Sequence, residues 1–195
     1  MSLAIYLVTF TCVVGFCLSE VVVDDFNANP NAASSYLEVS DFVMKGVSKA
    51  VLVPHNGPNS KGAVLFTLLE PQTDGAAFAG VRRVANFDFS GHQEIRLRLK
   101  NRGEYTGYQL VLKNSQEANT VSYANYFDAA QKDFGEINLA LSGFEAQLHG
   151  KKVDDAPALD ISKITSVGIY AYGGVYRNRK QNGVAALEID YIKAV

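Results

Sequence analysis

Few residues of this chain combine the types and spacing that catalysis needs. Both cysteines, Cys12 and Cys17, fall within the first nineteen residues, so the rest of the chain has no thiol to act as a nucleophile or metal ligand. The histidines His55, His92 and His149 fall in polar, turn-like segments, and no two of them stand at a ligand spacing such as i, i+4. No Gly-x-Ser-x-Gly elbow, phosphate-binding loop or dinucleotide-binding motif occurs. The sequence therefore predicts a protein with no catalytic residue and no cofactor.

Acidic residues offer one arrangement that could hold a metal ion. Asp24 and Asp25 lie in an early apolar segment, and Glu188 and Asp190 alternate on one face of the last such segment. If these segments pair, four carboxylates come together, which suits Ca²⁺ with its roughly six to eight oxygen ligands. The simpler interpretation is that these side chains are solvated and point outward from an edge strand. We therefore predict no metal site.

Tyrosines and basic residues suggest a binding face in the second half of the chain. In the segment 166–172, Tyr170 and Tyr172 alternate with Val167 and Ile169, so they are expected to face away from the core. Aromatic rings and arginines are favoured at interfaces, and rings also stack on sugars. The alternative is ordinary cross-strand pairing of tyrosines on a half-buried face. The candidate face comprises Tyr108, Tyr123, Tyr126, Tyr170, Tyr172, Arg96, Arg98 and Lys113.

The elements that carry these residues are predicted to be β-strands. In Glu94 to Lys100 the apolar residues Ile95, Leu97 and Leu99 alternate with charged ones, which is typical of a strand with one buried face. The same period predicts strands within 108–112, 137–141, 167–171 and 185–191. Less regular segments that are rich in β-forming residues and bounded by turn residues predict further strands within 21–26, 42–44, 50–53, 63–69, 78–84 and 121–127. About ten short strands without helices need two stacked antiparallel sheets to bury their apolar faces. We expect an all-β jelly-roll sandwich formed by one domain, residues 20–195.

The first nineteen residues have the composition of a signal peptide. Residues 3–18 are apolar and free of Lys and Arg, and Ser19 offers a small residue for cleavage. We therefore expect secretion and no membrane span after removal of this leader. Because 18 basic and 20 acidic residues are scattered without a block of one sign, nucleic acid is not an expected partner.

Several segments resemble the complex I intermediate-associated protein 30 family. They are YLEVSDFVMKGVS (36–48), GAVLFTLL (62–69), AAFAGVRR (76–83), FDFSGHQEIRLRLK (87–100), ALDISKITSVGI (158–169) and VAALEIDYI (184–192). The resemblance implies a galactose-binding-like jelly roll related to family 11 carbohydrate-binding modules. The matching motif positions are Asp41, Met44, Gly46, Ser48 and Arg82, whereas Ser40 and Lys45 stand where the family pattern has Asn and Gly.

The resemblance and the leader favour different functions. The best-known members of that family are mitochondrial chaperones for assembly of complex I, whereas the leader of this chain favours the secretory route. Because a fold does not determine a function, we expect a non-catalytic binding or chaperone-like protein with an unknown protein or glycan as partner. The alternatives are a mitochondrial assembly factor for complex I and a secreted lectin-like module that binds carbohydrate.

Overall fold

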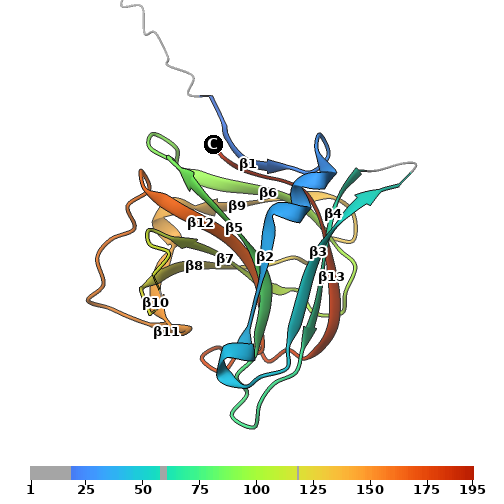
Figure 1. Ribbon diagram of the computed structural model, residues 1–195, viewed down its shortest axis with the longest axis vertical. Coiled ribbons are helices and arrows are strands. Elements are labelled where there is room, and N and C mark those ends of the chain that lie inside the picture. The colour runs from blue at the N-terminus through green and yellow to red at the C-terminus, as the bar shows by residue number, and fades with distance from the viewer. Residues whose placement is uncertain (1–18, 58–60, 118) are drawn as a thin grey trace, which may run out of the picture.

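The computed structural model describes residues 19–57, 61–117 and 119–195. Thirteen strands and three short 3₁₀ helices make up the regular structure of this part of the chain. The expected leader, with Cys12 and Cys17, lies outside the described residues except for Ser19. The strands form two antiparallel sheets that face each other (Figure 1). No helix within the described ranges is long and apolar enough to cross a membrane.

The first sheet, sheet A, contains six strands. Its order is β3-β4-β13-β6-β9, and β1 pairs with the end of β13. The strands are β1 (Val21–Asp25), β3 (Lys49–Asn56), β4 (Lys61–Leu69), β6 (Glu94–Asn101), β9 (Gly135–Ala140) and β13 (Gly183–Ala194). Strand β13 lies at the centre because it pairs with β4 along its first half and with β6 along its second half.

The second sheet, sheet B, contains seven strands in the order β11-β10-β8-β7-β12-β5-β2. They are β2 (Tyr36–Ser40), β5 (Phe78–Phe87), β7 (Gly107–Lys113), β8 (Ser122–Asp128), β10 (Glu145–Leu148), β11 (Lys151–Lys152) and β12 (Ile164–Tyr172). Strand β12 pairs with β5 on one side and β7 on the other, so these three strands form the middle of the sheet.

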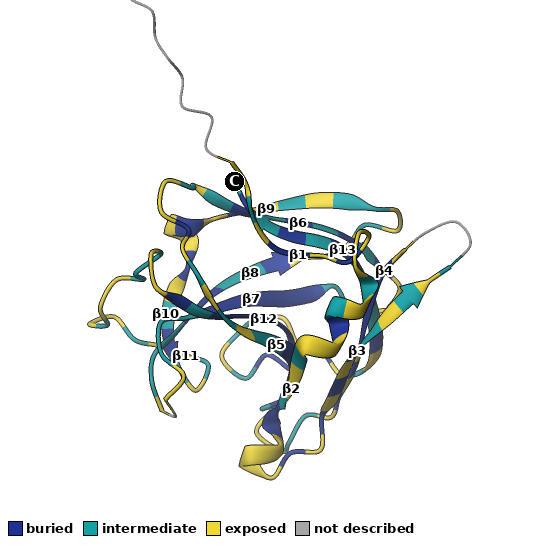
Figure 2. Ribbon diagram, turned by 45° about the horizontal axis from the view of Figure 1, so that its top comes forward, coloured by how far each residue is buried: buried dark blue, intermediate teal, exposed yellow. Residues whose placement is uncertain are grey.

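The core lies between the two sheets, as the period-two pattern predicts. Leu97 and Leu99 of β6, Leu110 of β7 and Ile169 of β12 are each at most 1% exposed and belong to one apolar cluster. Figure 2 shows buried residues concentrated along the central strands of both sheets. The predicted all-β sandwich of two antiparallel sheets is thus confirmed, with a core that needs no disulfide among the described residues.

Two kinds of difference from the predicted strands have local causes. Residues 42–44, expected as a strand, belong to the 3₁₀ helix η2 (Asp41–Met44), which the left-handed residue Lys45 (φ 63°) ends. Strands β2, β10 and β11 were not expected, because they are short and lie toward the edges of sheet B, where one face is open to solvent. The helices η1 (Pro30–Ser35) and η3 (Leu141–Gly143) complete the elements.

Candidate functional site

The outer face of sheet B, turned away from the core, carries a group of rings and a cation. The rings of Tyr126 on β8 and Tyr172 on β12 meet edge to face with their centroids 5.2 Å apart. The guanidinium of Arg177, in the β12–β13 connection, lies 3.6 Å from the centroid of the Tyr126 ring. We call Tyr126, Tyr172 and Arg177 the aromatic group. Edge-to-face ring pairs and cation–π contacts are both favourable, so the group holds its own geometry.

Two glutamines connect the aromatic group to the sheet. The hydroxyl of Tyr126 donates to Oε1 of Gln147 at 3.0 Å, and Nε2 of Gln147 donates to Oε1 of Gln109 at 3.4 Å. Gln109 and Gln147 are 9% and 6% exposed, and both amides retain polar atoms beyond these bonds. A side-chain row of this kind presents fixed donors and acceptors beside aromatic rings.

The loop that carries Arg177 is fastened to the sheet by Gln181. The side-chain amide of Gln181 accepts from the Gly107 backbone N–H at 2.7 Å and donates to the carbonyls of Gly107 and Tyr172 at 3.0 and 2.8 Å. A Cβ at position 107 would lie 2.6 Å from Oε1 of Gln181, so this close approach requires glycine. The ion pair of Arg179 with Asp128 adds a second connection. The position of Arg177 is therefore fixed by the loop before any ligand binds.

Tyr170 lies flat against the same face. It belongs to a small apolar cluster on the outer side of sheet B with Val111 and Ala124, separate from the main core. A Cβ at Gly80 would come within 2.6 Å of the Tyr170 ring, and one at Gly168 within 2.5 Å of its hydroxyl. The Tyr170 ring therefore packs directly against the backbone of Gly80 and Gly168, where a side chain would displace it. Burial raises the pKa of Tyr170 to about 12, and the charge of Arg82 opposes this rise.

Arg82 and Lys113 lie beside Tyr170 on this outer face. Arg82 on β5 pairs in register with Gly168, and Lys113 on β7 pairs with Ser166, two residues along β12. Burial lowers the pKa of Lys113, and the neighbouring positive charge of Arg82 lowers it further. The face therefore has an aromatic end, around Tyr172, and a cationic end, around Arg82.

Two tyrosines of the predicted face lie on the other side of the sheet. Tyr108 is fully buried in the main core, and Tyr123 is 4% exposed in the same cluster. Both alternate with outward residues, since Gln109 and Ala124 occupy the neighbouring positions on the outer side. Burial raises the pKa of both phenols. The structure thus corrects the prediction for Tyr108 and Tyr123, whose rings build the core.

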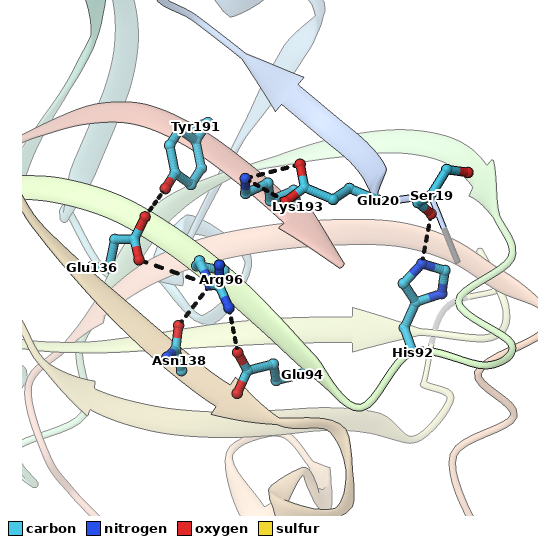
Figure 3. A network of polar contacts seen from close by, with 9 residues as sticks. All are labelled: Ser19, Glu20, His92, Glu94, Arg96, Glu136, Asn138, Tyr191 and Lys193. Atoms are coloured by element: carbon cyan, nitrogen blue, oxygen red, sulfur yellow. Dashed lines mark hydrogen bonds and ion pairs between the residues drawn. The ribbon is translucent and has the colours of Figure 1, made fainter. Parts of the chain in front are cut away.

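Two arginines of the predicted face lie on sheet A. Arg96 on β6 donates to Asn138 at 3.1 Å and to Glu94 at 3.0 Å, and Figure 3 shows it at the centre of a polar network with Glu136. Arg98 forms an ion pair with Asp190. Their strand has the right alternation but belongs to the opposite sheet, which period alone does not reveal. Arg96 and Arg98 are therefore separated from Tyr126, Tyr170, Tyr172 and Lys113, which do share one face.

The carboxylates that could suit Ca²⁺ each have a different partner. Asp24 pairs with Arg83, Glu188 with Arg102 at 2.9 Å, and Asp190 with Arg98. Asp25 Oδ1 instead accepts from the backbone N–H of Ala28 at 2.8 Å. Across residues 19–57, 61–117 and 119–195 no three His, Cys, Asp or Glu side chains gather as metal ligands would. Asp24, Glu188 and Asp190 are each neutralised by a different arginine.

Comparison with known families identifies the chain. A model of the family described as complex I intermediate-associated protein 30 matches residues 25–189. The chain belongs to this family. No curated protein sequence matches the chain. The intermediate-associated protein 30 match covers all strands of the sandwich from the end of β1 to the middle of β13.

Solved structures show that the intermediate-associated protein 30 fold of this chain is a jelly roll. The family 11 carbohydrate-binding module of a cellulosomal cellulase from Clostridium thermocellum is similar with a TM-score of 0.66 and 16% identity, over 92% of this chain and 95% of that one. The module from the same organism in complex with a β-1,3-1,4-mixed-linked tetrasaccharide gives 0.67 and 16%, over 90% and 95%. An exo-β-agarase gives 0.57 and 15%, over 90% of this chain but only 24% of the agarase. The predicted jelly-roll fold is confirmed.

The intermediate-associated protein 30 motif around position 41 builds a turn. The carboxylate of Asp41 is fully buried and accepts from the Ser48 backbone N–H at 3.1 Å and the Ser48 hydroxyl at 2.6 Å. A Cβ at Gly46 would lie 2.2 Å from Cγ of Asp41, so only glycine fits there. Asp41, Gly46 and Ser48 therefore hold the chain after η2, whereas Met44 is 41% exposed on the surface of that turn.

The predicted face did not include Gln109, Gln147 and Arg177, and only the first of these could have been assigned from the sequence. Gln109 alternates with Tyr108 and Leu110, so period two already places it on the outer face. Gln147 lies in a four-residue strand too short to show a period, and Arg177 lies in a loop whose path depends on Gln181. These two positions could be found only from the folded chain.

Proposed function

We propose that this protein is a non-catalytic binding protein that holds a glycan across the outer face of sheet B. The observation that carries the proposal is the aromatic group of Tyr126, Tyr172 and Arg177 next to the amides of Gln109 and Gln147. Sugars present both an apolar face of C–H groups and a ring of hydroxyls. Tyrosine rings contact the first and fixed amides hydrogen-bond the second.

The fold supports the same proposal. A family 11 module that this chain resembles over 90% of its length was solved with a β-1,3-1,4-mixed-linked tetrasaccharide. Identity with that module is only 16%, so the likeness supports the use of this fold for glycans and leaves the sugar open. The exo-β-agarase match also supports the use of this fold in proteins that act on polysaccharides. The matched part is 24% of that enzyme.

Binding to a panel of soluble polysaccharides, including mixed-linked β-glucan, tests this proposal by affinity electrophoresis and calorimetry. We expect Tyr172→Ala to weaken binding about tenfold, because a lost ring contact of about 1.4 kcal/mol corresponds to that factor. Tyr191→Ala is the matched control, since Tyr191 lies on sheet A and bonds to Glu136 (Figure 3). Equal losses in both variants, or no binding to any glycan, would contradict the proposal.

A second candidate function is binding of a protein through the turn that contains η2. Phe42, Val43, Met44 and Val47 are 68%, 84%, 41% and 60% exposed, and the buried Asp41 fixes the turn that displays them. The family name refers to association with intermediates of complex I. Exposed apolar side chains on a rigid turn support a protein partner. A photoreactive cross-linker at position 43 tests this candidate, with position 74 on another turn as control; equal products from both would refute it.

We also propose that the chain enters the secretory route. Support comes from the apolar, Lys- and Arg-free composition of residues 3–18. A reporter fused to the first 25 residues checks this proposal. Reporter in the medium supports secretion, whereas reporter in mitochondria supports the alternative role as an assembly factor for complex I.

A further inference from the structure

Arg82 differs from every other arginine of the chain. The chain has seven arginines, and six of them form ion pairs with carboxylates, namely Arg83, Arg96, Arg98, Arg102, Arg177 and Arg179. Among the described residues Arg82 has no such partner. Its Nε is buried and makes no hydrogen bond to any part of the chain that the structure describes. A buried guanidinium N–H without an acceptor is costly, so an acceptor supplied by a ligand at this position would be favourable.

A second cation lies close to Arg82. Arg82 and Lys113 project from the strands on either side of β12, next to Gly168 and Ser166. Because Gly168 has no side chain, the Tyr170 ring can lie over the strand between the two cations. Lys113 Nζ donates to the backbone carbonyl of Glu117 at 3.3 Å, which leaves its other two N–H groups available. Two neighbouring positive charges repel each other, and a bound anion would relieve that repulsion.

The hydroxyl of Tyr170 supplies a third donor at the same place. It lies over Gly168, where a methyl group would come within 2.5 Å of the oxygen. Burial raises the pKa of this phenol to about 12, so at neutral pH the hydroxyl keeps its proton. The uncharged neighbours on the outer face include Leu37, which pairs with Arg82, and Val111, which pairs with Gly168. The cationic end of the face therefore offers donors without a nearby carboxylate from β2, β5, β7 or β12.

We infer that Arg82, Lys113 and the Tyr170 hydroxyl form a subsite for an anionic group, so that the glycan bound by this protein is an acidic polysaccharide. The inference rests on the proposed function and specifies its ligand class. Arginine binds carboxylate and sulfate through two parallel N–H···O bonds, and lysine adds a point charge. The aromatic group lies on the same face and contacts the sugar rings, while the subsite selects the charged substituent.

Three polymers separate the possibilities: polygalacturonate carries carboxylates, κ-carrageenan carries sulfates, and mixed-linked β-glucan is neutral. We expect one acidic polymer to bind the wild-type protein about tenfold or more tightly than the neutral one, with the preference decreasing as salt is added. Whichever acidic polymer binds identifies the anion. Arg82→Gln should abolish the preference, and Arg82→Lys should restore it only in part because the bidentate contact is lost.

The control variant is Arg96→Gln, which removes the same charge from the outer side of sheet A. Its preference should equal that of the wild type, and thermal unfolding of each variant verifies that the fold is intact. Equal loss in Arg96→Gln and Arg82→Gln would show non-specific attraction and overturn the inference. If the neutral glucan binds as tightly as or more tightly than both acidic polymers, and its binding needs Tyr172 but not Arg82, the inference is also overturned, while the proposed function stands.

A titration with inorganic sulfate tests the anion subsite without any polysaccharide. In a sulfate titration monitored by NMR, the Nε–Hε resonance of Arg82 should shift while that of Arg96 stays in place. An unmoved Arg82 resonance overturns the subsite even if a polysaccharide binds. A shifted Arg82 resonance without binding to any polysaccharide keeps the anion subsite and refutes the glycan-binding function.

Discussion

Replacing Asp41 with asparagine tests whether the family motif acts on stability. In the native fold Oδ2 of Asp41 accepts from the Ser48 hydroxyl at 2.6 Å and from the Phe78 N–H at 3.4 Å, while Oδ1 accepts from the Ser48 N–H. Asparagine keeps one acceptor and turns an N–H₂ group toward the remaining donors. Hydrogen bonds to a charged group are worth about 1.5–3 kcal/mol, so with the long Phe78 bond counted lightly the cost is about 3 kcal/mol.

Thermal and urea unfolding measure the effect of Asp41→Asn. For a chain of this size about 3 kcal/mol corresponds to a decrease of Tm by about 6–12 °C. Asp74→Asn is the matched control, because Asp74 also accepts from a backbone N–H, that of Ala76 at 2.9 Å, but at an exposed turn. It should change stability by less than about 0.5 kcal/mol. If Asp41→Asn costs no more than the control, the buried carboxylate does not hold the turn after η2.

Three further predictions concern the outer face of sheet B and the buried phenols. Gly168→Val should displace the Tyr170 ring, destabilise the fold by about 1–3 kcal/mol and abolish binding of acidic polymers, as checked by urea unfolding and affinity electrophoresis. Gly75→Ala, at a turn with φ of 84° and open space around it, should leave binding unchanged. Stability should decrease as pH rises from about 10 to about 12, because burial raises the pKa of Tyr105 and Tyr170 to about 12 while unfolded tyrosines ionise near 10. The native state then holds protons that the unfolded state has lost, so urea midpoints should decrease over that window, and a flat profile would refute the assigned burial. Gln181→Ala should weaken glycan binding although Gln181 itself does not contact the ligand, because Arg177 loses its fixed position. Calorimetry measures this loss, and thermal unfolding verifies that the fold is intact.

Much of the sandwich could be predicted because alternation reports burial directly. The pattern of Glu94 to Lys100 predicts the strand, its inner leucines and its outer arginines, and all three agree with β6. The strand predicted at residues 42–44 was wrong, because three apolar residues in a row show no period-two alternation. There the left-handed Lys45 and the buried Asp41 decide the conformation.

The candidate site could be predicted only in part, since alternation assigns a side but not a sheet. Tyr170 and Tyr172 were assigned correctly to the side opposite Val167 and Ile169. Tyr108 has the same residue type and lies only one strand away, yet it faces the core. Strand order brings Tyr126 beside Tyr172, because β7 pairs with both β8 and β12, and it separates both tyrosines from Arg96, because β6 belongs to sheet A.

Mapping of backbone amide shifts with a bound oligosaccharide tests the central claim most directly. The protein is titrated with a short oligosaccharide prepared from whichever polymer binds it most tightly. The shifts are predicted to cluster on β7, β8 and β12 and in residues 173–181, and to extend to Arg82 on β5 when the sugar is acidic. Shifts confined to β3, β4 and β13 or to the turn after η2 would contradict the assignment of the outer face of sheet B as the binding surface.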